Sequence, residues 1–394
     1  MLTPLTSFTK SLWQYRFILM KKTVFVGMSG GVDSSLSAAL LKKQGFEVVG
    51  VFIRTWHPEF IECNEEEERR DAMRVAAHLD IPFLTFDLED VYKKEVADYM
   101  ISEYKKGRTP NPDVMCNKYV KFGAFLKKAI SMGADYVATG HYSQVRQSLK
   151  KESFVNSDVG LPGYPEQKSS FFELLKGNDA SKDQSYFLWT LNQDQLSKIL
   201  FPVGSLQKSE VRSLARKFKI PVANKKDSQG ICFLGPIDLK EFLAHYIKEK
   251  KGNVLNEKGE VVGHHLGATF FTMGERHGFT LTKKSPSDKP FYVIAKDIKN
   301  NTITVSDTPK KLPNKESLKV YEIENVNWIS GTPKESKKYS AQIRYHGESL
   351  PCRVSYNEKR KIYSVSFDKP ILVSEGQSIV IYDKDVTMGG GIVK

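Results

Sequence analysis

The chain has 394 residues, of which 40% are hydrophobic and 27% charged, and Lys plus Arg exceed Asp plus Glu by 13. This length is more than one hydrophobic core usually holds, so we expect two or three domains. The basic excess favours a polyanionic partner such as nucleic acid, and no apolar run is long enough to predict a membrane span. The four cysteines form no CxxC pair, which argues against a zinc ribbon or a disulfide scaffold and favours a reducing compartment, here the cytoplasm.

Residues 1–20 contain no acidic residue and only two basic ones, Lys10 and Arg16, among several serines and threonines. Such a segment fits a weak organellar transit peptide. The alternative is an overlong start, with Met20 as the true initiator directly before the first strand. We prefer this alternative because arginine is scarce.

A glycine-rich turn follows the first predicted strand. Residues 23–27 have the pattern of a short buried strand, Gly30 and Gly31 follow in a tight turn, and a helix then runs to about Gly45. The backbone amides of the two glycines can approach a phosphate closely, and the helix dipole favours negative charge at that point. The lysine of a Walker loop and the glycine spacing of a dinucleotide loop are both missing. We therefore expect a phosphate-binding loop of another kind; a βα turn without a ligand is the alternative.

Strands and helices alternate through the first third of the chain. Strands are predicted at 47–52, 83–88 and 135–139, and helices at 64–79, 91–104 and 117–132. This order predicts an α/β fold with a parallel, doubly wound sheet, which binds ligands beyond the carboxyl ends of its strands.

The pattern of predicted elements changes twice further along the chain. We expect a surface loop at 147–170, a strand at 171–175, two or three helical pieces over 185–219, a short helix at 239–247 and short strands at 341–345, 351–356, 362–367 and 377–382. Evenly spaced short strands predict a small closed β-barrel. The expected domains are an extension (1–20), a catalytic domain (21–234), a small central domain (235–298) and a C-terminal barrel (299–394).

One candidate reactive thiol lies in the proline-stiffened loop 107–117. Cys116 is predicted to stand at the start of a helix, where the helix dipole, Lys118 and Lys121 would stabilise its thiolate. Asp113 precedes it by three residues and is a candidate for moving a substrate proton.

A second candidate thiol lies in the polar loop 225–235, where paired lysines precede Cys232. The spacing does not show whether Cys116 and Cys232 meet. Cys63 and Cys352 are interpreted as structural, since the first precedes an acidic helix and the second lies within a predicted strand.

Six motifs in order resemble those of the tRNA-specific 2-thiouridylases, a family of ATP-pyrophosphatase (PP-loop) enzymes. They are Ser29-Gly30-Gly31-Val32-Asp33-Ser34, residues 108–118, residues 138–142, residues 182–188, residues 227–233 and the final glycines 389–391 with Ile392. The resemblance covers residues 21–394. It implies a PP-loop, adenine nucleotide α-hydrolase-like catalytic domain, a small central domain and a C-terminal β-barrel that binds tRNA.

The resemblance also implies roles for single residues. Those that match nucleotide contacts are Gly27, Met28, Ser29, Gly30, Gly31, Val32, Asp33, Ser34, Ile53 and Gly140. Those that match tRNA contacts are Asn111, Pro112, Asp113, His141, Lys182, Asp183, Gln184, Arg344, Tyr345 and Gln377. Cys232 matches the cysteine that carries a persulfide, and Cys116 matches the partner that attacks it or becomes disulfide-bonded to it. Gln229 and Ile53 stand where Thr and Met are usual, and neither change touches the chemistry.

Members of this family thiolate C2 of the wobble uridine in the tRNAs for Lys, Glu and Gln. The resemblance implies ATP and Mg²⁺ as cofactors, with no metal held by protein residues alone, and a sulfur-carrier protein or cysteine desulfurase as sulfur donor. We also expect a monomer without membrane contact. The alternatives are a small-molecule PP-loop ligase, which would need neither thiol, a non-catalytic tRNA-binding protein, and an RNA-thiolating enzyme that acts on another nucleotide.

Overall fold

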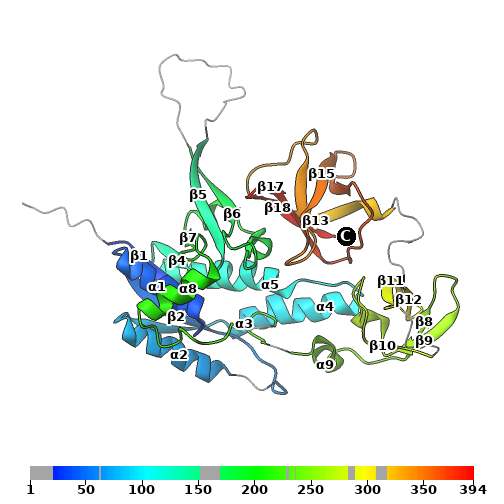
Figure 1. The fold of residues 1–394 in the computed structure, drawn as a ribbon, viewed down its shortest axis with the longest axis horizontal. Coiled ribbons are helices and arrows are strands. Elements are labelled where there is room, and N and C mark those ends of the chain that lie inside the picture. Colours follow the sequence, from blue (N-terminus) through cyan, green and yellow to red (C-terminus); the bar gives the residue numbers. More distant parts are fainter. Residues whose placement is uncertain are drawn as a thin grey trace, which may run out of the picture.

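The structure, a computed structural model, describes residues 21–61, 64–150, 169–227, 230–235, 237–282, 289–307 and 317–394. Residues 1–20 and Cys63, whose roles were predicted from the sequence, lie outside these ranges. Figure 1 shows a helix-covered sheet, a small β unit at the far end of helix α4 (Tyr99–Lys105), and a C-terminal β unit beside the upright hairpin β5–β6. No helix in the described ranges is long and apolar enough to cross a membrane.

The first unit is built on a five-stranded parallel sheet in the order β3-β2-β1-β4-β7. The strands are β1 (Thr23–Gly27), β2 (Glu47–Arg54), β3 (Phe83–Asp87), β4 (Tyr136–Ala138) and β7 (Ile199–Leu200). The chain leaves β1 toward β2 on one side and returns as β4 on the other. The loops after β1 and β4 therefore meet at the carboxyl edge, at the switch point where such folds bind ligands. The predicted doubly wound fold is confirmed.

Helices cover both faces of this sheet because the strand side chains alternate between them. Val24 and Val26 are fully buried on the face covered by α1 (Val32–Lys43), α2 (Glu65–His78) and α8 (Lys208–Lys217). Phe25 points to the other face, where it packs 6.3 Å from Phe86, ring centre to ring centre. The second face is covered by the helices that follow β3.

These helices differ from the two regular α-helices predicted at 91–104 and 117–132. The first consists of α3 (Glu89–Tyr92), a π-helical segment η1 (Lys93–Asp98) and α4. The second consists of α5 (Pro112–Met115), a π-helical segment η2 (Cys116–Phe125) and α6 (Leu126–Ser131). The second begins five residues before the predicted start, because Asn111 caps the amide of Val114 at 3.1 Å and Pro112 fits the first turn.

Two further expectations for this unit were wrong. The loop predicted from residue 147 begins within a strand, since β5 (Ser143–Lys150) pairs antiparallel with β6 (Ser169–Lys176). The region 185–219 is also not purely helical. It contains η3 (Ser185–Leu188), α7 (Gln193–Leu196) and α8, but the two-residue strand β7 lies between the last two. A strand this short leaves no periodicity to read.

The middle unit is a helix, α9 (Leu239–Ala244), followed by a five-stranded sheet in the order β10-β9-β8-β12-β11. Its strands are β8 (Gly252–Leu255), β9 (Val261–His265), β10 (Phe279–Leu281), β11 (Tyr292–Asp297) and β12 (Thr302–Ser306), with a 3-10 turn η4 (Ala268–Phe270). Because β12 pairs with both β8 and β11, we place the end of this unit after Ser306 and not at residue 298.

The C-terminal unit is a closed barrel, as predicted. A 3-10 turn η5 (Ser317–Lys319) leads into β13 (Val320–Trp328), β14 (Tyr339–Gln342), β15 (Leu350–Asn357), β16 (Ile362–Phe367), β17 (Ser378–Asp383) and β18 (Val386–Val393). Pairing of β13 with β18 closes it. Strand β18 also pairs with β6, through Val386 with Leu175 and Thr387 with Leu174, so the barrel continues into the hairpin of the first unit.

Candidate active site

The loop after β1 has the backbone of an anion-binding turn. Gly30 has φ +70°, and a Cβ at that position would lie 2.4 Å from the carbonyl oxygen of Glu68, so only glycine fits. Gly31 precedes α1 and no side chain caps that helix end, which leaves its first amides for a ligand. The Ser34 hydroxyl instead accepts a 3.2 Å bond from the amide of Ser29 and thereby shapes the loop. In the loop after β4, Gly140 packs so closely that an added Cβ would lie 2.6 Å from the nitrogen of Ser34.

The remaining candidate nucleotide residues lie around this turn. Met28 and Val32 are buried beneath the loop, and Ile53 is buried on β2. Asp33, in the first turn of α1, accepts a 2.7 Å hydrogen bond from the Tyr142 hydroxyl. The structure thus gathers the predicted nucleotide residues from β1, α1, β2 and the end of β4 at one edge of the sheet.

A chain of charged groups links this loop to the loop that carries Cys232. The ammonium of Lys208, at the start of α8, lies 2.7 Å from Asp33 and 2.9 Å from Asp227. Lys182 and Arg212 also pair with Asp227, at 2.8 and 2.7 Å. Although burial alone would raise the pKa of Asp227, these cations lower it to about 2. Asp227 is therefore a fixed anion on the Cys232 loop, and Lys208 joins it to the nucleotide loop.

The two candidate thiols meet in space. The sulfur atoms of Cys116, the first residue of η2, and Cys232 lie 3.5 Å apart. The Cys232 loop is fixed from several sides: its amide donates to Asp113 at 2.9 Å and its carbonyl accepts from the Tyr92 hydroxyl at 2.7 Å. The imidazole of His57 also contacts the carbonyl of Phe233 at 2.8 Å.

The surroundings give the two thiols opposite acidities. Burial, followed by the hydrogen bond to Cys232, raises the pKa of Cys116 well above its ordinary value. That same hydrogen bond, with the nearby ammonium of Lys121, lowers the pKa of Cys232 against the effect of burial. The sequence predicted a stabilised thiolate at Cys116 from its place at a helix start. That prediction was wrong, because the helix starts at Pro112 and Cys116 is 0% exposed.

Asp113, one of the predicted tRNA residues, lies beside the thiols and accepts the amide of Cys232. Burial raises the pKa of its carboxyl, against the opposing hydrogen bond from the Cys232 amide and the charge of Lys121. A carboxylate with a raised pKa is suited to accept a proton near neutral pH.

The predicted tRNA residues come from several elements of the first and C-terminal units. The ring of Tyr345 packs 4.4 Å from that of Phe187, and its pKa is raised to about 12 by burial and by the charges of Asp183 and Asp113. Gln377 follows Gly376, where an added Cβ would lie 3.0 Å from the Cβ of Arg108 in the loop before α5, and the amide of Thr109 in that loop donates to the carbonyl of Glu375 at 2.7 Å. The barrel therefore reaches the loop directly before the helix that carries Asp113.

Gln184, Asp183 and His141 also have internal partners in this structure. The side chain of Gln184 accepts a 3.0 Å bond from the amide of Tyr142, and Asp183 accepts from the amide of Gly177 at 3.0 Å. His141 is 6% exposed, and its Nδ1 bonds the Thr139 hydroxyl at 2.7 Å. Burial and the charge of Lys121 lower the pKa of His141 well below its ordinary value, so its ring is neutral.

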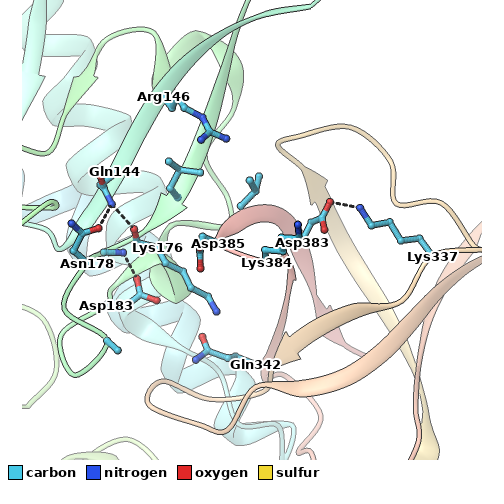
Figure 2. Close-up of a pocket in the computed structure, with 14 residues that line it drawn as sticks. Gln144, Arg146, Lys176, Asn178, Asp183, Lys337, Gln342, Asp383, Lys384 and Asp385 are labelled. Carbon is cyan, nitrogen blue, oxygen red and sulfur yellow. Dashed lines mark hydrogen bonds and ion pairs between the residues drawn. The ribbon is translucent and has the colours of Figure 1, made fainter.

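An open groove of about 820 Å³ lies between the hairpin β5–β6 and the barrel (Figure 2). Its charged and amide-bearing lining residues are Gln144, Arg146, Lys176, Asn178, Asp183, Lys337, Gln342, Asp383, Lys384 and Asp385. Lys337 is paired with Asp383 at 2.5 Å, whereas Lys176 lies over the ring of Tyr382 at 4.3 Å. The groove is thus a polar surface that includes the predicted tRNA residue Asp183.

Comparisons with known proteins agree with this organisation. Three family profiles match in order: "tRNA methyl transferase HUP domain" over residues 22–236, "tRNA methyl transferase PRC-barrel domain" over 240–307, and "Aminomethyltransferase beta-barrel domain" over 319–393. The chain is 40% identical to "tRNA-specific 2-thiouridylase MnmA" of Nitrosomonas europaea, over 95% of this chain and 98% of that one. It is also 40% identical to the protein of the same name from Enterococcus faecalis, over 95% of each chain. The chain belongs to the tRNA-specific 2-thiouridylase family.

The profile names and the thiouridylase relatives point to different reactions, and the site agrees with the latter. Two thiols in contact and a phosphate loop suit sulfur transfer driven by ATP. Among solved structures, a 4-thiouridine synthetase in complex with RNA and ATP is 18% identical over 57% of this chain and 50% of that one, with a TM-score of 0.33. A similarity of that size carries no further conclusion.

Sequence reasoning missed several residues of this thiouridylase site. Lys208 joins Asp33 to Asp227, Arg212 pairs with Asp227, and Tyr142 bonds Asp33. Lys208 and Arg212 look like ordinary helix residues in the sequence, and Tyr142 stands out only as the last residue of the motif 138–142. Tyr92 supports the Cys232 loop from more than 100 positions away, since 140 residues separate them. The sequence named Lys118 and Lys121 together, but the ammonium of Lys118 lies 4.9 Å from the Tyr119 ring centre, while Lys121 faces the thiols.

Proposed function

We propose that this protein catalyses ATP-dependent 2-thiolation of the wobble uridine in tRNAs of the Lys, Glu and Gln type. The observation that carries the proposal is the 3.5 Å contact between Cys116 and Cys232, linked through Asp227 and Lys208 to a phosphate loop. A small-molecule ligase would need the phosphate loop but not the thiol pair. A protein that only binds tRNA would need neither.

The reaction needs two steps because the C2 oxygen of uracil is a poor leaving group. In the first step the C2 oxygen attacks the α-phosphate of ATP, pyrophosphate leaves, and the N3 proton passes to the carboxylate of Asp113. The loop amides around Gly30 and Gly31 would hold the phosphates as negative charge moves onto the departing pyrophosphate. The oxygen then leaves easily as part of AMP.

In the second step a persulfide on Cys232 supplies the sulfur. Its terminal sulfur, as an anion, forms a bond to C2 while the C2–O bond breaks and AMP takes the electron pair. Cys116 then attacks the Sγ of Cys232, so that a Cys116–Cys232 disulfide forms and the bond to the terminal sulfur breaks. The thiol proton of Cys116 passes to uracil N3. The transferred sulfur is reduced, two thiols are oxidised, and an external thiol must reset the disulfide.

The residues around the phosphate loop fit a magnesium ion that arrives with ATP. Mg²⁺ is usually bound through one or two carboxylates and the substrate phosphates. Asp33 is a carboxylate beside the loop, and it would exchange its ion pair with Lys208 for the ion. When bound, the ion would neutralise phosphate charge. The described residues include no cluster of three or more His, Cys, Asp or Glu that could hold a metal without ATP.

We propose that the anticodon arm binds across the barrel and the groove of Figure 2, so that the target uridine turns out of its stack toward Asp113. Arg344, Tyr345 and Gln377 of the C-terminal unit and Lys182 to Gln184 of the first unit border this path. The net charge of +13 supports binding to the phosphate backbone, and affinity is then expected to fall steeply with salt.

The sulfur donor, oligomeric state and location are further parts of the proposal. A half-buried Cys232 can receive sulfur from a sulfur-carrier protein or from a cysteine desulfurase. One chain supplies the phosphate loop, both thiols and the barrel, so a monomer suffices. Because a reductant must reopen the disulfide after each turnover, we place the protein in the reducing cytoplasm.

The direct test uses a wobble-uridine tRNA transcript with ATP, Mg²⁺ and a persulfide donor, and follows pyrophosphate and 2-thiouridine together. We expect the wild type to form both, and Cys116→Ser and Cys232→Ser to release pyrophosphate while transferring little sulfur. If tRNA elicits no pyrophosphate, or if both variants thiolate as well as the wild type, the proposal is wrong.

A further inference from the structure

We propose that Lys121 is a positioning residue for sulfur transfer: its ammonium holds the Cys232 sulfur as an anion and so gives the two thiols their different roles. This inference rests on the proposed function and adds a group to it. The hydrogen bond from Cys116 stabilises a sulfur anion on Cys232, whereas the carboxylate of Asp113 opposes it. A cation beside Cys232 adds a charge that stabilises this anion without giving up a proton.

Lys121 reaches the thiols because its helix is π-helical over Cys116–Phe125. In an α-helix of 3.6 residues per turn, a residue five positions after Cys116 would point about 140° away from it. In a π-helix, residues five apart are joined by a backbone hydrogen bond and share a face. The π-helical segment therefore places Cys116 and Lys121 on the same side. Such segments are frequent at functional sites.

The contacts of Lys121 converge on the sulfur site. Its ammonium lies 5.6 Å from the centre of the Phe233 ring, directly after Cys232 in the chain. Its positive charge lowers the pKa of the Cys232 thiol. Although burial alone would lower the pKa of Lys121, Cys232, Cys116 and Asp113 raise it above its ordinary value. Lys121 therefore remains charged, and the anionic groups facing it offset the cost of its burial.

The arrangement separates the two thiols by function. Next to Lys121, Cys232 is the thiol that ionises first, so it is the one that accepts sulfur and carries the persulfide anion. Cys116 keeps its proton until it attacks Cys232, and it then has that proton to deliver to uracil N3. Lys121 takes up and releases no proton in this sequence. It stabilises negative charge on sulfur throughout.

The titratable groups that face Cys232 are Cys116, Lys121 and Asp113, with Tyr92 behind the loop. The test is the pH dependence of Cys232 alkylation by iodoacetamide in the reduced full-length protein, followed by mass spectrometry of the Cys232 peptide. The variants are Lys121→Met, which removes the charge, Lys121→Arg, which keeps it, and Lys118→Met as the matched control on the same helix. Thermal unfolding of each variant shows whether it is folded.

We expect Lys121→Met to alkylate at least about tenfold more slowly near neutral pH, with its profile displaced to higher pH. Lys121→Arg should stay close to wild type, and Lys118→Met should match it. Equal alkylation of Lys121→Met and wild type, or equal slowing in Lys118→Met, would overturn the proposal. If Lys121→Met does not fold, Lys121→Gln is measured against the same two outcomes. The assay uses neither tRNA nor ATP, so its failure is distinct from failure of the proposed function.

Discussion

Cys116 and Cys232 are the same residue type in contact with each other, yet the two regions that carry them differ in almost every respect. Cys116 lies on a helix and is fully buried, and its pKa is raised. Cys232 lies in a half-buried loop tied down by Asp113 and Tyr92, and its pKa is lowered. The difference shows that thiol chemistry is set by the groups around each sulfur and not by the local sequence.

The largest expected effect is the separation of the two cysteine roles. Cys232→Ser should bind no transferable sulfur, whereas Cys116→Ser should accept sulfur and stop with tRNA joined to Cys232 through it. Both should lose thiouridine formation by at least about 10³-fold, since each removes a covalent partner. Mass spectrometry of the Cys232 peptide distinguishes them, and an added small thiol should release thiouridine only from Cys116→Ser. If tRNA becomes joined to the enzyme through sulfur equally in both variants, the two thiols are interchangeable.

Removing the charge of Asp113 tests whether this residue acts as a base in the reaction or only holds the Cys232 loop in place. In Asp113→Asn an oxygen can still accept from the Cys232 amide, but no base remains. We expect thiolation to fall by about 10²- to 10⁴-fold. Because burial raises the pKa of Asp113, the wild-type rate should rise with pH as the carboxyl ionises at a pH above its ordinary range, and this limb should vanish in the variant. Single-turnover rates measured across acid and neutral pH check this prediction. If the rate of Asp113→Asn still rises with pH as in the wild type, another group is responsible for that rise.

A change in the nucleotide region should affect a different readout. In Gly140→Ala the new Cβ would lie 2.6 Å from the nitrogen of Ser34, so the phosphate loop must shift. We expect tRNA-dependent pyrophosphate release to fall by up to about 10²-fold, the scale of a misplacement of about 1 Å. Alkylation of Cys232 should not change. If pyrophosphate release persists while only sulfur transfer falls, the loop after β4 does not serve the nucleotide.

The nucleotide loop and the thiol pair also differ in how far the sequence predicted them. The strand, glycine turn and helix of residues 23–43 follow from local pattern, because buried alternation and helix capping act within a few residues. The thiol pair does not, because 116 residues separate its members and only tertiary packing joins them. The resemblance named both cysteines but could not give their environments.

The π-helical segment η2 escaped prediction for a physical reason. Phe125 at its end and Ala129 in the following helix α6 are four residues apart, which fits an α-helical pattern, so a period of 3.6 was assumed. The strands β5 and β7 were missed because one runs into an expected loop and the other has two residues. Side-chain partners such as Lys208 depend on which loops meet, and the sequence carries no local signature of that.

A second buried lysine, Lys296, differs from Lys121 in the direction in which its pKa is shifted. Lys296 donates to the carbonyls of Gly107 and Phe271, at 2.8 and 2.6 Å, where the middle unit meets the first. Burial lowers its pKa to about 8, and the charges of Glu375 and Glu275 oppose this shift only in part. Between pH 8 and about 10 the unfolded chain therefore binds more protons than the folded chain, so this residue makes stability rise with pH.

Chemical unfolding of wild type and Lys296→Met at several pH values measures this smallest effect. We expect the stability difference between them to grow in favour of the wild type by about 1–3 kcal/mol over that pH range. Below pH 8 both states bind the proton and the difference should be flat. A difference that is independent of pH throughout would mean that Lys296 is as solvated as a surface lysine.

The most direct test of the account is to count disulfides in a single turnover. Persulfide-loaded protein in excess over tRNA is mixed with ATP and Mg²⁺ without reductant, quenched with an alkylating agent, and digested for mass spectrometry. We predict one Cys116–Cys232 disulfide for each 2-thiouridine formed. Formation of 2-thiouridine while both cysteines remain free thiols would contradict the account, because the sulfur would then have been released by another route.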